Sequence, residues 1–165
     1  MNIRRILLPT DFSEYSRAAE RSACELVDRF GAELHVLHVL HDLMLTMPLT
    51  AAALLIPPKS LDNEITFAEE EIQKVPPPRW ANGKKIVRAV RIGTVYDTIV
   101  QYAKDNAIDL IVIGTHGRTG LSHVLLCSVA ERVVQHATCS VMTVRPEQKV
   151  AVPSATPQRA ALETV

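Results

Sequence analysis

The stretch that most constrains the fold is residues 110–113, four successive apolar residues with the sequence LIVI. A short apolar run of this kind is typical of a central strand in a parallel sheet, because such a strand is covered on both faces. Four other segments read as strands by their apolar or alternating character: residues 3–8, 32–40, 85–92 and 140–144.

Between these runs, apolar residues recur at helical spacing. We expect helices that begin at residues 11–13, at 61, at 94–96 and at 122, with Ser13 as a cap of the first and Gly31 just past its end. The alternation predicts an α/β fold: one doubly wound, five-stranded parallel sheet with helices on both faces. Right-handed crossovers and a doubly wound order are the default for such an alternation. We expect the Rossmann-like strand order 3-2-1-4-5.

Composition narrows the class of protein. The chain has 165 residues, 47% of them hydrophobic, which fits one domain with a single core. Eighteen basic and eighteen acidic residues leave no net charge, and aromatic residues are scarce at 4%, so the sequence argues against nucleic-acid binding. The apolar tract of residues 43–58 is too short and too rich in proline to span a bilayer, so we expect no membrane segment.

Two further compositional features concern location and order. The three cysteines form no CxxC pair, and the start of the chain lacks the apolar core of a signal peptide. Both features indicate a cytoplasmic protein. We expect a domain over residues 1–146 and a poorly ordered tail over residues 147–165, which has no apolar pattern.

Two loops follow strands that can be neighbours in such a sheet, namely residues 9–11 (PTD) and 114–122. Ligands in open α/β folds bind beyond the carboxyl ends of the strands, where the strand order reverses. Gly114 and Gly117 allow a sharp turn and expose N–H groups that form an anion-binding nest together with a helix N-terminus. Arg118, Thr119 and Ser128 offer further donors. The spacing matches neither GxxxxGK[ST] nor GxGxxG, so it supports phosphate binding and a simple turn equally.

Other polar residues favour plainer interpretations. His35, His38 and His41 resemble a metal cluster, but strand side chains alternate, so His35 and His38 point to opposite faces and a metal site is disfavoured. A solvent-exposed role is favoured for His116. For Cys127, a small apolar filler is favoured over a reactive thiol.

Longer stretches carry a family resemblance. The segments are PTDFSEYSRAA from residue 9, AELHVLHV from residue 32, GTVYDTIVQYAKDNAIDLIV from residue 93, and IGTHGRTGLSHVLLCSVAERVVQHATCSVMTVRP from residue 113. Together they strongly resemble the universal stress protein family, in particular its ATP-binding subgroup. The resemblance covers residues 1–146 and is weakest over residues 42–85.

The resemblance implies an adenine-nucleotide site. It places adenosine against the first loop, with Asp11 bonding adenine or ribose and Val39 lining the adenine pocket, and places ribose and phosphates on the glycine loop. Mg²⁺, where present, would be held through phosphates and water. The binding residues that it implies are Pro9, Thr10, Asp11, Val39, Ile113, Gly114, His116, Gly117, Arg118, Thr119, Gly120, Cys127, Ser128, Val129 and Ala130. It also implies a homodimer through the last strand, Ser140 to Arg145.

Cys127 departs from the family pattern, which has glycine there. Its Cβ and sulfur occupy space where backbone approaches phosphate, which predicts a weaker grip on the terminal phosphates. The leading hypothesis is a stress-response protein that binds ATP, ADP or AMP and acts by binding rather than turnover. The alternatives are a nucleotide-free dimeric module whose pocket Cys127 has closed, and a slow ATP hydrolase or self-phosphorylating protein with Ser128 or Thr119 as acceptor.

Overall fold

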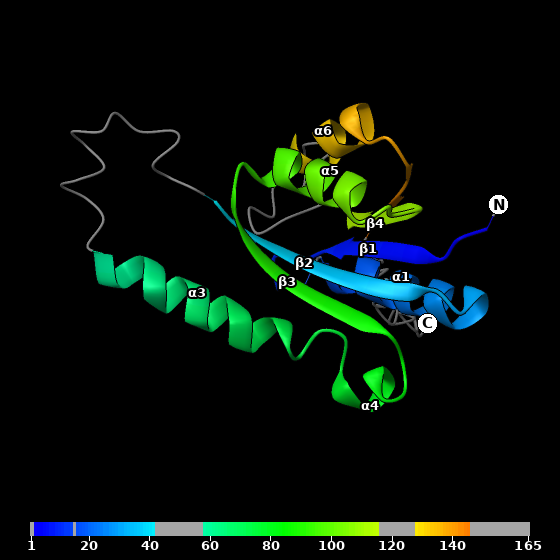
Figure 1. Cartoon of the computed structure of the whole chain (residues 1–165), viewed down its shortest axis with the longest axis horizontal. Helices are drawn as coiled ribbons and strands as arrows, with labels where there is room; N and C mark the ends of the chain where they lie inside the picture. The colour runs from blue at the N-terminus through cyan, green and yellow to red at the C-terminus, as the bar shows by residue number, and fades with distance from the viewer. Residues whose placement is uncertain (1, 15, 42–57, 116–127, 146–165) are drawn as a thin grey trace, which may run out of the picture.

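The computed structural model describes residues 2–14, 16–41, 58–115 and 128–145 (Figure 1). Within these ranges the strands are β1 (Arg5–Pro9), β2 (Glu33–His41), β3 (Ile86–Gly93), β4 (Leu110–Gly114) and β5 (Ser140–Val144). The helices are α1 (Ser16–Phe30), α3 (Pro58–Ile72), α4 (Pro78–Ala81), α5 (Val95–Asp105) and α6 (Ser128–His136). None of the helices in these ranges has the length and apolar character needed to cross a bilayer.

The strands form one parallel sheet in the order β3-β2-β1-β4-β5, which confirms the predicted fold class. β1 lies at the centre, where Ile6 pairs with Leu34 of β2 on one side and with Leu110 of β4 on the other. Among the described strands, β3 and β5 are the two edges, each paired to a single neighbour. The strand order reverses between β1 and β4, so this is the switch point of the sheet.

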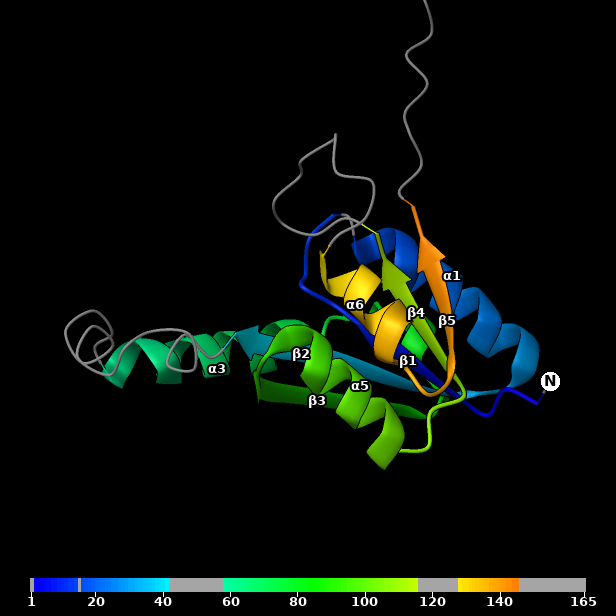
Figure 2. The same ribbon diagram turned by 90° about the horizontal axis from the view of Figure 1, so that it is seen from above.

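Helices cover the sheet on both faces (Figure 2). Ile6 and Leu8 of β1 join a buried cluster with α1 and α3 residues, whereas Leu7 between them joins a second cluster with α5 and α6 residues. β4 follows the same alternation, and Leu110–Ile113 are all buried. All four residues of the LIVI run are apolar because helices cover both faces of this strand, as predicted.

The ends of α1 show why the helix begins and ends where it does. The Ser13 hydroxyl accepts a hydrogen bond from the Ser16 N–H at 3.3 Å, so Ser13 caps the helix as predicted. At the other end, the Gly31 N–H donates to Val27 O at 2.9 Å with the Gly31 backbone in the left-handed region (φ +63°). Glycine adopts this conformation without steric cost, which explains its position after the helix.

One short helix was not predicted. α4 lies between α3 and β3, and its Trp80 Nε1 donates to Asp28 Oδ2 of α1 at 2.9 Å. Lys84 also forms an ion pair with Asp28, and its Nζ lies 4.6 Å from the centroid of the Trp80 ring. The segment that leads to β3 is thus fastened to the C-terminal part of α1.

The end of α1 yields a stability test. A Cβ added at Gly31 would meet no atom within 4 Å, so the penalty of a side chain is confined to the backbone conformation. We expect Gly31→Ala to lower the free energy of unfolding by about 1 kcal/mol. Gly31→Asn should cost less, because asparagine tolerates left-handed backbone better. Equal losses in the two variants, measured by urea unfolding, would contradict this explanation.

Candidate functional site

The carboxyl ends of β1, β2 and β4 meet at one edge of the sheet. Pro9, the last residue of β1, pairs with Leu37 of β2, and the Thr10 N–H that follows donates to Leu37 O at 2.9 Å. On the other side of β1, Leu7 is in register with Ile111 of β4. Because all these strands are parallel, Pro9, Val39 and Gly114 end up at the same edge.

The predicted site residues on this edge share one face of the sheet. Val39 of β2 and Ile113 of β4 both pack in the cluster that contains α5 and α6 residues. Val129 packs against the same cluster, and Ala130 is completely buried in it. The structure therefore brings the apolar members of the predicted nucleotide site together beside the start of α6.

The loop between β1 and α1 is held by short-range hydrogen bonds. Thr10 Oγ1 accepts the Phe12 N–H at 3.1 Å and is 3.2 Å from Ser16 Oγ. Asp11 Oδ1 accepts the Ser13 N–H at 3.0 Å, the arrangement of an Asx turn. Phe12 between them has a left-handed backbone, with φ of +62°. These bonds give the loop that carries Thr10 and Asp11 one defined shape.

His38 of β2 supports this loop from below. Its Nδ1 lies 2.8 Å from Thr10 O, and because a carbonyl only accepts, Nδ1 carries the hydrogen. The imidazole also stacks on the Phe12 ring, with centroids 4.3 Å apart. His38 is 7% exposed. His38 thus contacts the loop at both Thr10 and Phe12, a role that the sequence did not predict.

The end of β4 is tied to the last strand. The Thr115 N–H donates to Val144 O of β5 at 3.0 Å, and Thr115 is buried. The glycine loop therefore leaves the sheet from a fixed point. Its remaining predicted ligands, His116, Gly117, Arg118, Thr119, Gly120 and Cys127, lie outside the described residues.

The first turn of α6 supplies backbone donors. Ser128, Val129 and Ala130 are its first three residues. The first N–H groups of an α-helix have no intrahelical acceptor, and the helix dipole makes them attractive to anions. The side chains of Val129 and Ala130 face the core, so any contact of these residues with a ligand is made by their backbone.

Comparison with known proteins agrees with this geometry. The model of the family described as "Universal stress protein family" matches residues 2–145. This chain belongs to that family. A universal stress protein of Methanocaldococcus jannaschii, MJ0531, is 34% identical over 147 residues, which make up 88% of this chain and 84% of that protein.

Solved structures of universal stress proteins share the fold. UspA from Lactobacillus plantarum superposes with a TM-score of 0.76 at 28% identity, covering 88% of this chain and 99% of that one. A universal stress protein from Archaeoglobus fulgidus, solved in complex with dAMP, has a TM-score of 0.59 at 19% identity and covers 88% of this chain and all of that one. At 19% identity, the similarity to the Archaeoglobus fulgidus protein shows a shared fold alone.

His35 and His38 of β2 in this universal stress protein lie on opposite faces, as predicted: His35 contacts α5 and His38 contacts Phe12 and Thr10. His35 Nδ1 is 3.0 Å from the Tyr102 hydroxyl of α5, and its Nε2 is 3.4 Å from Glu33 Oε1. Burial lowers the pKa of His35, which favours the neutral ring. Across residues 2–14, 16–41, 58–115 and 128–145, no three His, Cys, Asp or Glu side chains come together as metal ligands.

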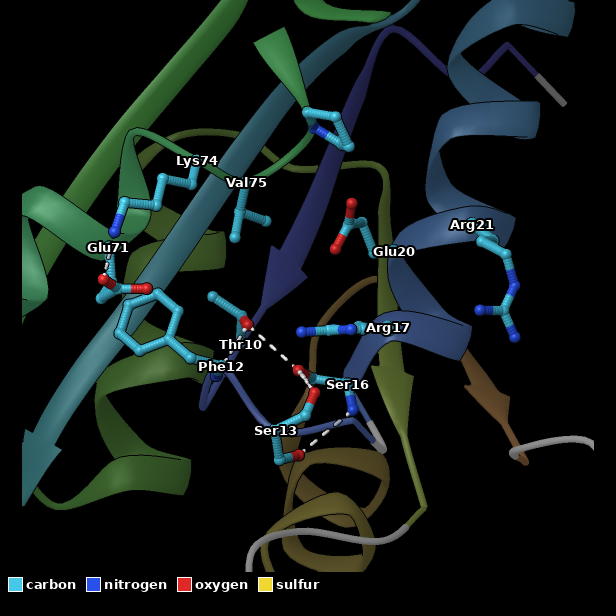
Figure 3. A pocket seen from close by; sticks show the side chains of 11 residues that line it. Thr10, Phe12, Ser13, Ser16, Arg17, Glu20, Arg21, Glu71, Lys74 and Val75 are labelled. Carbon is cyan, nitrogen blue, oxygen red and sulfur yellow. Dashed lines mark hydrogen bonds and ion pairs between the residues drawn. The ribbon is translucent and has the colours of Figure 1, made fainter.

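A cavity of about 370 Å³ lies on the other face of the sheet, between the N-terminal part of α1 and the segment that follows α3 (Figure 3). Thr10, Phe12 and Ser13 form one wall, so the β1–α1 loop separates this cavity from the face that carries Val39 and Ile113. The sequence did not predict the cavity, because its walls come from two segments that are at least fifty residues apart.

The contact of His38 with Thr10 can be tested by substitution. His38→Leu removes the donor to a buried carbonyl and should lower the free energy of unfolding by about 2 kcal/mol. His38→Asn should recover part of the loss, because asparagine Nδ2 stands as many bonds from the backbone as imidazole Nδ1. Chemical unfolding of the three proteins measures both effects. An asparagine variant no more stable than the leucine variant would show that the hydrogen bond is unimportant.

Proposed function

We propose that this universal stress protein binds an adenine nucleotide at the carboxyl ends of β1, β2 and β4 and acts through that binding rather than through catalytic turnover. The observation that carries the proposal is the convergence of the Thr10–Asp11 loop, the apolar pair Val39 and Ile113, and the first turn of α6 at the switch point of the sheet. The dAMP complex of a protein with the same fold supports the choice of adenine.

The residues present suit the parts of such a ligand. Val39 and Ile113 offer an apolar wall to a flat base, and the Asp11 carboxylate at the loop offers an acceptor to adenine or ribose. The N–H groups at the start of α6, which have no intrahelical acceptor, suit phosphate oxygens. Mg²⁺ would be bound by the phosphates and water, because the described residues provide no cluster of ligands for it.

A ligand that binds only the folded chain raises its midpoint of thermal unfolding. At a hundredfold excess over the Kd, ATP or AMP should raise that midpoint by roughly 5–10 °C, with GTP as the matched control. Asp11→Ala should reduce the shift with adenosine as well as with ATP, since Asp11 is assigned to the nucleoside. No shift with any adenine nucleotide at millimolar concentration would refute the proposal.

Cys127 provides a test directed at the phosphates alone. If its side chain obstructs the approach of phosphate to backbone, Cys127→Gly should tighten ATP binding about tenfold and leave adenosine binding unchanged. Cys127→Ala retains the Cβ without the sulfur, so its ATP affinity should lie between those of the wild type and Cys127→Gly. Calorimetric titration of the three proteins measures these affinities. Equal ATP affinities would mean that position 127 does not limit phosphate binding.

We further propose that two copies pair through β5. β5 is an edge strand, hydrogen bonded to β4 alone among the described strands, and its Met142 side chain is 40% exposed. An unpaired strand edge with an exposed apolar side chain favours association with another strand. Cys24 and Cys139 are both free thiols, which fits a reducing cytoplasm as the location.

The dimer can be tested at Met142. We expect Met142→Glu to shift the molar mass measured by light scattering from dimer to monomer at micromolar concentration, because the two strands would bring like charges together. Phe67→Glu changes an apolar residue on α3 that is still more exposed, at 55%, and is the matched control. A wild-type protein that is monomeric would disprove the pairing, as would a Met142→Glu variant that stays dimeric.

A further inference from the structure

The cavity between α1 and the segment after α3 is large enough for a small molecule and lies across the β1–α1 loop from the rest of the predicted nucleotide site. Its volume of about 370 Å³ is in the range of sites for small organic molecules. It lies on the face of Ile6, Leu8 and α1, whereas Val39 and Ile113 belong to the opposite face. Thr10 lines this cavity and also belongs to the loop of the proposed nucleotide site, so a molecule here and a nucleotide beside α6 would be neighbours on the two sides of the β1–α1 loop.

Arg17, an exposed residue of α1, supplies a positive charge to the rim of this cavity. Figure 3 shows its guanidinium extending from α1 toward Thr10 and Ser16. In the part of the chain that the structure describes, Arg17 makes no ion pair and no side-chain hydrogen bond. A guanidinium with all its donors available suits the oxygens of a phosphate or carboxylate.

Glu20, one turn further along α1, supplies an acceptor. Its carboxylate points into the same space in Figure 3, and it too has no ion pair or hydrogen bond within the described ranges. The side chain is half-buried, and this burial raises the pKa of Glu20 despite the positive charges of Arg17 and Arg21. A carboxylate that is partly dehydrated and lacks a donor gains from hydroxyl groups on a ligand.

The rim of the cavity adds a charged donor, Lys74, and a neutral donor, Ser13. Lys74 follows the end of α3 and forms an ion pair with Glu71 of that helix at 2.5 Å. The Lys74 side chain remains largely exposed. The Ser13 hydroxyl accepts a bond from the Ser16 N–H and keeps its own hydrogen for another acceptor. Together with Arg17, these residues place cationic and neutral donors around one part of the cavity, with Glu20 as the acceptor beside them.

We propose that this cavity is a second binding site, which takes a small sugar phosphate with its phosphate at Arg17 and Ser13 and its hydroxyl groups at Glu20. A phosphate ester without hydroxyl groups gives the Glu20 carboxylate no donor, and a neutral sugar gives the Arg17 guanidinium no anionic oxygen to bind directly. A ligand that has both groups serves both side chains.

Ribose 5-phosphate is a suitable probe, with ribose and inorganic phosphate as its separate halves. Calorimetric titration of the full chain at low ionic strength should show ribose 5-phosphate binding at least tenfold more tightly than either half. Arg17→Ala should weaken binding of ribose 5-phosphate about tenfold or more, since a charge-assisted hydrogen bond is lost. Arg29→Ala removes the same charge from the last turn of α1, outside the cavity, and should leave the affinity within about twofold.

Glu20→Ala distinguishes the two halves of the ligand. It should weaken binding of ribose 5-phosphate several-fold and leave that of inorganic phosphate unchanged or slightly tighter, because it removes a negative charge. No binding of ribose 5-phosphate to the wild type would overturn the proposal, and so would equal losses in Arg17→Ala and Arg29→Ala. Competitive displacement by ATP would overturn it too, by placing the sugar phosphate in the nucleotide site. A chain that binds ribose 5-phosphate but no nucleotide would uphold this site and refute the proposed function.

Discussion

The structure depends on the burial of β1 from both sides. A strand at the centre of a parallel sheet must present apolar residues to two layers of helices, and Ile6, Leu7 and Leu8 do so with no exposed surface. This requirement fixes the register with β2 and β4 and leaves the chain at Pro9 with its next residues beyond the sheet. The Thr10–Asp11 loop thus stands at the switch point because of packing, independently of any ligand.

The sheet, its order and the strand ends at the site could be predicted because they follow from local patterns and topology. The four apolar residues LIVI predict a buried strand, and the alternation of strands with helices predicts that the carboxyl ends of β1 and β4 lie at the same edge of the sheet. α4 was missed because four residues after a run of prolines show no period. The family resemblance added the roles of individual residues, which spacing alone did not determine.

The contacts of His38 and the α1–α3 cavity could not be predicted from the sequence pattern. The contact between His38 and Thr10 depends on the register of β2 on β1. The ring of Phe12 stacks on His38 from a left-handed backbone, an unusual conformation for an aromatic residue. The cavity likewise requires that the end of α3 approach the start of α1. Each depends on the placement of distant segments, so the individual residues give no signal in advance.

The bond from Thr115 to Val144 has a consequence for the molecule as a whole. It joins the start of the glycine loop to β5. The strand proposed to pair two copies therefore contacts the residue from which the proposed phosphate loop begins. Any displacement of β5 on association would change the position from which that loop begins. By thermodynamic reciprocity, a nucleotide that favoured one position of the loop would then favour one state of assembly.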